Sequence, residues 1–135
     1  MRGIIVSAVL ASLMLIGAGC GKPTAEGVAK EFVSLMQAGK FAEAAELWDL
    51  QAEGRAQNPD WDTFGESQRK LIIQKDLAPK KAALLQQWAT AMPAGTKVAS
   101  VTESGTTAQA ALEGGQLRAL QLVKVGESWK IAGMQ

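Results

Sequence analysis

Cys20 is the only cysteine in the chain and the residue best placed for covalent chemistry. An apolar stretch from position 3 to 16 precedes it, Arg2 is the one charge in that region, and Ala18 and Gly19 stand immediately before the thiol. A basic start, a short apolar segment and small residues at its end are typical of a cleaved secretory signal. The thiol lies at the expected cleavage point. Because Cys20 is the only cysteine, it has no disulfide partner within the chain.

The residues from Leu15 to Cys20 resemble the lipobox of bacterial lipoproteins, although Gly17 stands where that pattern prefers Leu. The resemblance implies removal of residues 1–19 and acylation of Cys20, whose two or three chains would anchor the protein stably in a membrane. The alternatives are an ordinary signal peptide or an uncleaved anchor. About 14 apolar residues reach roughly 21 Å as a helix, short of a hydrocarbon core of about 30 Å, which disfavours the anchor. We therefore expect a lipid-anchored protein of the cell envelope.

The second residue after the cysteine is Lys22 rather than Asp. In this respect the chain resembles lipoproteins that are passed on to the outer membrane, where the cell has one. Residues 20–23 would form the lipidated N-terminus and a short tether, and residues 24–135 one domain.

The exported part of the chain has no net charge. One of the 14 basic residues is Arg2, which would be removed, so 13 basic residues remain against 13 acidic residues. This neutrality argues against a nucleic-acid partner, which would require a basic surface.

The mature chain begins with helical periodicity and ends with strand periodicity. The sequence predicts a polar loop over 51–60, because Gly54 and Asn58-Pro59 fall there. Helices are expected from Thr24, as N-cap, to about 39, and over 41–48, about 62–75 and 79–92. Strands are expected over 97–103, 106–112, 116–125 and 128–134. The fold class is therefore α+β, with N-terminal helices packed on the concave side of a curved, antiparallel, four-stranded meander.

The third expected strand is apolar on both faces. Leu117 and Val123 share one face, whereas Leu120 and Leu122 occupy the other. If the first face points to the core, the two leucines lie on the outer side of the sheet. This pattern predicts a homodimer through that outer face.

The helical hairpin over 28–44 and the final hairpin over 120–131 resemble those of small nuclear transport factor 2-like, or cystatin-like α+β, lipoproteins. The resemblance spans nearly the whole mature chain and implies a cone-shaped fold, but it implies no reaction. Enzymes of that group, such as the ketosteroid isomerase-like proteins, place an acid or base in the cone, often beside Tyr or His. This chain contains neither, so only Asp49, Asp60 or Asp62 could serve. We expect a non-enzymatic protein, with an isomerase-type or cyclase-type enzyme as the alternative.

No cofactor or metal is expected. Without histidine, a transition-metal site would need carboxylates alone, and the calcium-loop-like run from Asp60 fails at Phe64 and Leu71, where ligands are required.

Four tryptophans stand out against few other aromatic residues. Three of them, Trp48, Trp88 and Trp129, fall on apolar faces, whereas Trp61 lies in the predicted loop at the expected mouth of the cone. The simpler interpretation is that the tryptophans fill the core between helices and sheet, and packing is also the favoured role for Trp61. The alternative hypothesis is that Trp48, Trp61, Phe64 and Trp88 line a pocket that would hold a small apolar ligand or a segment of an envelope protein.

Overall fold

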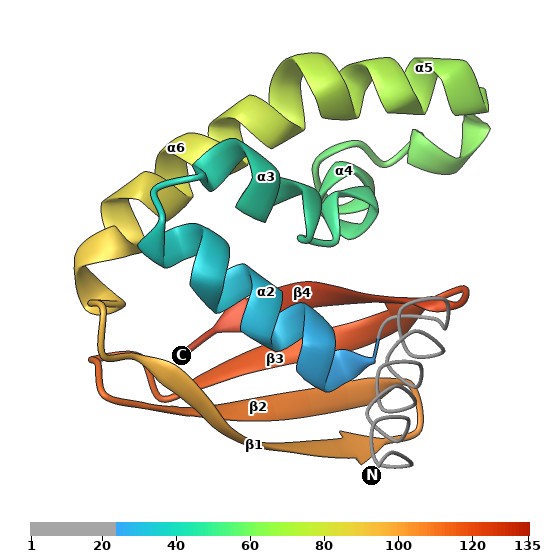
Figure 1. Cartoon of the computed structure of the whole chain (residues 1–135). Coiled ribbons are helices and arrows are strands. Elements are labelled where there is room, and N and C mark those ends of the chain that lie inside the picture. Colours follow the sequence, from blue (N-terminus) through green and yellow to red (C-terminus); the bar gives the residue numbers. More distant parts are fainter. Residues whose placement is uncertain (1–23) are drawn as a thin grey trace, which may run out of the picture.

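The computed structural model describes residues 24–135, so the predicted signal peptide, Cys20 and the tether lie outside the described residues (Figure 1). Helices come first along the chain: α2 (Ala25–Gln37), α3 (Phe41–Glu46), α4 (Leu50–Gln57), α5 (Glu66–Ile72) and α6 (Ala78–Trp88). Two short helical segments lie between them, η1 (Trp61–Thr63) and η2 (Ile73–Leu77), and a third, η3 (Ala89–Ala91), follows α6. The strands follow: β1 (Lys97–Ser104), β2 (Thr107–Glu113), β3 (Ala119–Val125) and β4 (Ser128–Met134).

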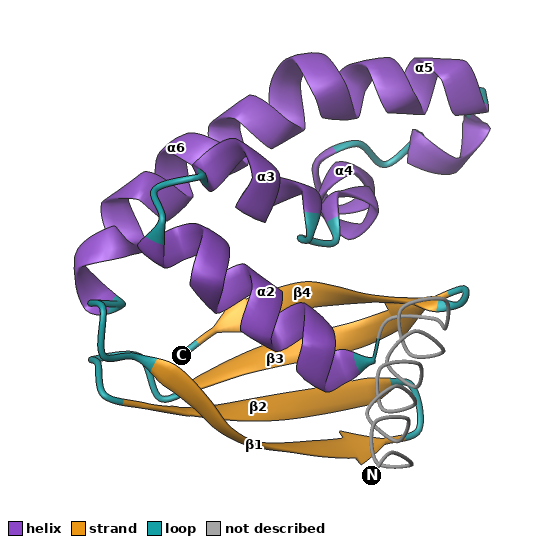
Figure 2. Ribbon diagram, in the orientation of Figure 1, coloured by secondary structure: helices purple, strands orange, loops and turns teal. Residues whose placement is uncertain are grey.

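The four strands form one open antiparallel sheet in the order β1-β2-β3-β4. Glycines with positive φ stand at each of the three strand connections: Gly105, Gly114 and Gly126. Figure 2 shows the strands in one layer and the helices on one side of it. The α+β class and the four-stranded meander predicted from the sequence are confirmed for residues 24–135.

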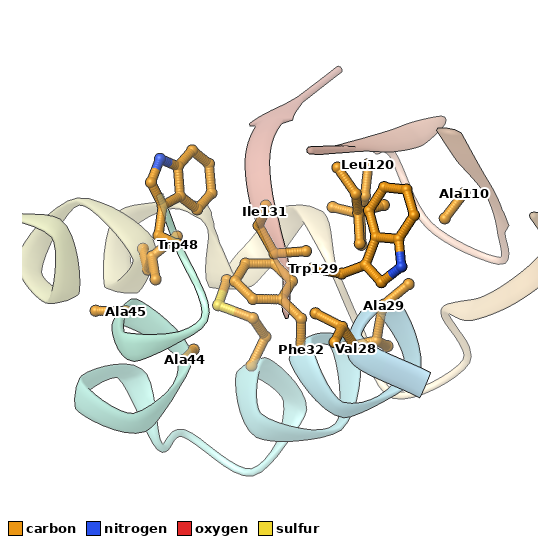
Figure 3. Close-up of a cluster of buried hydrophobic side chains, with 14 of the residues drawn as sticks. Val28, Ala29, Phe32, Ala44, Ala45, Trp48, Ala110, Leu120, Trp129 and Ile131 are labelled. Carbon is orange, nitrogen blue, oxygen red and sulfur yellow. The ribbon is translucent and has the colours of Figure 1, made fainter. Parts of the chain in front are cut away.

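Helix α2 lies across one face of the sheet and supplies more buried core residues than any other helix (Figure 1). Thr24 caps it as predicted, because its side-chain oxygen accepts a hydrogen bond of 2.9 Å from the Gly27 amide. In Figure 3, Phe32 and Ile131 lie between the indole rings of Trp48 and Trp129. All four side chains are buried, so residues from both ends of the domain share one core.

The outward placement predicted for Leu120 and Leu122 is wrong, since both face the core at 0% and 2% exposure. They lie opposite Ala110 and Ala108 of β2, whose small side chains leave room beneath α2. The outer face of β3 carries Gln121 instead. The two leucines therefore cannot form the dimer surface that was predicted from their exposure.

The polar loop predicted over 51–60 is also wrong, since most of it is helix α4. Asp49 caps this helix by accepting a hydrogen bond of 3.2 Å from the Ala52 amide. Gly54 is a packing glycine, because a Cβ there would lie 2.5 Å from the Trp61 ring. The glycine that indicated a loop thus allows a close contact between the helix and an aromatic ring.

The helices predicted over 62–75 and 79–92 join into one rod, in which α5, the π-helical turn η2 and α6 follow without interruption. The amide of Ala78 bonds back to the Ile73 carbonyl, five residues earlier. Pro79 follows directly, and its ring cannot pack against an ordinary α-helical carbonyl four residues before it. The wider π turn relieves that clash, so the proline is accommodated inside the rod.

Candidate binding cleft

A cleft of about 480 Å³ lies where the α3–α4 corner, the rod from α5 through η2 to the start of α6, and the β3–β4 hairpin meet. Its apolar lining comes from all three regions: Trp48, Leu50, Ile73, Ala78 and Val125. Its polar lining also comes from all three: Glu46, Asp49, Gln51, Lys70, Gln74 and Lys130. An apolar wall with a few polar groups is the usual composition of a small-molecule site.

The position of Trp48 is fixed by the sheet. The chain beside it forms an isolated parallel bridge to β4, in which the Ile131 amide donates to the Leu47 carbonyl at 2.7 Å. The Asp49 amide in turn donates to the Ile131 carbonyl at 2.9 Å. This short extension of the sheet holds the indole ring against Phe32, with ring centroids 6.1 Å apart. The apolar wall of the cleft is therefore anchored to the core rather than to a loop.

A buried lysine packs on the same indole ring. Lys81 of α6 is 8% exposed, and its ammonium lies 4.1 Å from the Trp48 ring centroid. The same ammonium forms an ion pair with Glu53 of α4. A charge buried to this degree requires such partners, so Lys81 connects α6 to α4 behind the wall of the cleft.

The charges at the cleft are mixed, and two of them are engaged by the backbone. The Lys130 ammonium donates a hydrogen bond of 3.1 Å to the Glu46 carbonyl, and Asp49 caps α4. Lys70 and Gln74 stand one helical turn apart on the rod. These side chains offer a ligand both a cation and hydrogen-bonding groups at the rim of the apolar wall.

The structure does not bring together the four aromatic residues predicted to line one pocket, since only Trp48 lines the cleft. Trp61 is fully buried, and its indole N–H donates to the Gln51 side-chain oxygen at 3.1 Å. Phe64 packs edge-on against it, with ring centroids 6.0 Å apart. Trp88 is 40% exposed on α6 and lies outside the cleft. Trp61 therefore serves packing, the role that the sequence favoured for it, and does not stand at the mouth of the cleft.

Of the three carboxylates considered for catalysis, only Asp49 lines the cleft. Asp60 is exposed, and the Asp62 side chain forms an exposed ion pair of 3.1 Å with Arg55. Because Asp49 already accepts a hydrogen bond from the Ala52 amide, this candidate carboxylate has a structural role at the start of α4.

Sequence reasoning missed Lys81 and the residues that α5, η2 and the hairpin contribute to the cleft. A signal for Lys81 was present, since Leu77, Lys81 and Leu85 recur every four residues and share the buried face of the helix. Lys70, Ile73 and Val125 carry no such signal, because they enter the cleft only through the path of the rod and the hairpin.

Within residues 24–135, no three metal-ligating side chains gather at one place. None of the helices in this part of the chain is both long and apolar enough to span a bilayer. Comparison with protein-family models, with curated proteins and with solved structures found no match.

Proposed function

We propose that this protein is a lipid-anchored binding module of the bacterial cell envelope, and that its cleft holds a small ligand with an apolar body and a charged end. The observation that carries the proposal is the cleft itself, with a fixed tryptophan in its wall and a lysine at its rim. Its volume of about 480 Å³ lies within the usual range for small-molecule sites, roughly 300–1,000 Å³.

Anchoring at Cys20 is the second part of the proposal, and the residues before it support it. Four residues from Cys20 to Thr24 span at most about 14 Å, so a lipid on Cys20 would hold the domain close to the membrane surface. In diderm bacteria we place it at the outer membrane, on the basis of Lys22. Intact-mass measurement of the membrane-fraction protein tests this part. Loss of residues 1–19 and added acyl mass are expected for the wild type and not for Cys20→Ala, and an unmodified soluble wild type would refute it.

The nuclear transport factor 2-like cone is also part of the proposal, supported by the order of helices before an antiparallel sheet. In this chain the space between α2 and the sheet is filled by Phe32, Leu120 and Ile131, each fully buried. A ligand therefore has room at the side of the helical layer, in the cleft, and little room beneath α2.

The ligand experiment uses an amphiphilic probe of known chemistry, the aromatic sulfonate 1-anilinonaphthalene-8-sulfonate. We expect its fluorescence to rise on binding and Ile73→Asp to abolish the rise, because a carboxylate would then lie in the apolar wall. Lys70→Glu should weaken binding by repelling the sulfonate. Trp88→Leu is the matched control, since Trp88 is an exposed aromatic residue outside the cleft. Equal binding by the wild type, Ile73→Asp and Trp88→Leu would argue against the cleft as the site.

Catalysis by Asp49 is the second candidate, because this carboxylate lines the cleft. Isomerisation of a β,γ-unsaturated ketone, followed by absorbance, provides the assay. An enzyme of this type should lose turnover in Asp49→Asn and keep it in Asp62→Asn, whose site is the exposed pair with Arg55. Our proposal instead expects no turnover by the wild type, and measurable turnover that depends on Asp49 would replace it.

A further inference from the structure

The two edges of the sheet are treated differently by the rest of the domain. At the middle of the β4 edge, the segment 47–49 pairs with Ile131 through two backbone hydrogen bonds. The β1 edge pairs with β2 on one side and with no other segment of residues 24–135 on its second side. Every second residue of an antiparallel edge strand turns its N–H and C=O away from its partner strand. β1, the edge strand on the far side of the sheet from β4 in Figure 1, therefore directs hydrogen-bonding backbone groups away from the sheet.

The open edge is uncharged in its middle. Residues 98–102 read Val-Ala-Ser-Val-Thr, without the lysines or prolines by which proteins commonly blunt an edge strand. A bulge between Val98 and Ser100 interrupts the register with β2, whereas the register from Ser100 to Ser104 is regular. Five residues is an ordinary strand length, so this part of the edge is long enough to receive another strand.

A groove of about 350 Å³ continues from the start of this edge, between β1 and α2. Val33 and Val98 supply its apolar surface. Gln37 also lines the groove, and its side-chain amide donates to the carbonyls of Thr96 at 2.8 Å and Pro93 at 2.9 Å, which ties α2 to the segment before β1. An edge strand beside a helix, with a groove between them, is the geometry used for strand addition by an extended peptide.

The charged groups of the groove are both cations. Lys30 and Lys97 line it, and no carboxylate does. Each lysine has an ion-pair partner outside the groove, Glu26 at 2.7 Å and Glu113 at 3.4 Å, and all four side chains are more than half exposed. Exposed pairs of this kind contribute little free energy, so an incoming carboxylate can replace the present partner.

We propose that the β1 edge and this groove form a docking site for an extended, acidic segment of a partner protein. The segment adds a fifth strand beside β1 and places an apolar side chain between Val33 and Val98. Its carboxylates lie near Lys30 and Lys97. This site is separate from the cleft and does not depend on the ligand proposed there.

Three synthetic eight-residue peptides test the proposal on the full-length protein. Each has alternating Val and Thr; the first also carries two Glu, the second no charge and the third two Lys. We expect fluorescence anisotropy to show binding of the acidic peptide about tenfold tighter than that of the basic one, with salt reducing the difference. Amide hydrogen exchange should slow in β1 when the acidic peptide is bound. Equal affinities, or slower exchange confined to other strands, would overturn the proposal.

Two pairs of variants separate backbone pairing from charge. The turn at Gly105 closes on the pair Ser104 and Thr107, so ladder alternation directs the Glu103 N–H to the open edge. Glu103→Pro removes that donor and should weaken peptide binding about tenfold, whereas Glu103→Ala should not.

Lys30→Gln with Lys97→Gln should abolish the preference for the acidic peptide, whereas Lys40→Gln, at an exposed lysine outside the groove, should preserve it. Self-association of the protein through β1 with no peptide binding, measured by sedimentation, would assign the edge to a second copy and refute the proposal.

Discussion

Removal of the Lys81 charge gives the sharpest test of how the helical layer is held together. Lys81→Met keeps most of the aliphatic stem and removes the ammonium, which contacts the Trp48 ring and pairs with Glu53. Breaking a buried ion pair costs about 3–5 kcal/mol when one charge is left uncompensated. The Glu53 side chain is 29% exposed and retains some hydration, so we expect a smaller loss of about 1–3 kcal/mol in the free energy of unfolding.

Urea unfolding followed by tryptophan fluorescence measures this loss, with Lys80→Met as the matched control. Lys80 is the adjacent residue, but its pair with Asp76 is exposed, so its replacement should cost about 0.5 kcal/mol or less. The double variant Lys81→Met with Glu53→Gln should recover part of the loss, which gives a coupling energy of about 0.5–3 kcal/mol. Equal stabilities for Lys81→Met and Lys80→Met, or strictly additive effects of the Lys81 and Glu53 changes, would refute this reasoning.

Three further predictions concern packing and capping. Gly54→Ala should lower the free energy of unfolding by about 1–2 kcal/mol in urea titration, because its Cβ would overlap the Trp61 ring, whereas Gly95→Ala, where the nearest atom to a Cβ is 3.9 Å away, should cost much less. Leu122→Asp should abolish cooperative thermal unfolding in circular dichroism; a folded variant with a changed sedimentation coefficient would restore the dimer interface predicted from the sequence. Thr24→Ala should cost about 1 kcal/mol by loss of the N-cap and leave probe binding in the cleft unchanged; an unaltered midpoint in urea would contradict the cap.

Local patterns predicted those elements whose signals lie within a few residues. The Thr24 cap, the helical spacing of Val28 and Phe32, and the glycine-bearing strand connections all act over one or two turns of chain. They fixed the positions of α2 and the four strands to within a few residues. The predicted lipid site at Cys20 has the same local character, although it lies outside the described residues and stays a prediction.

Predictions that required knowing how neighbouring segments pack or join were less successful. Gly54 indicated a loop until Trp61 was placed against it, and Pro79 indicated a helix start until the π turn joined α5 to α6. The faces of β3 could not be assigned from alternation alone, because both of its faces carry apolar residues.

The sequence by itself determined the α+β order of elements, because periodicity, caps and turns depend on near neighbours along the chain. The prediction of lipidation at Cys20 rests on neighbours of the same kind, the small residues just before it. Only the tertiary structure decided which aromatic residue meets a cleft. Trp48 does so because its backbone pairs with β4, more than 80 residues away, while Trp61 is buried by its contact with Gly54. Burial depends on which segments pack together, and that packing is a property of the whole domain.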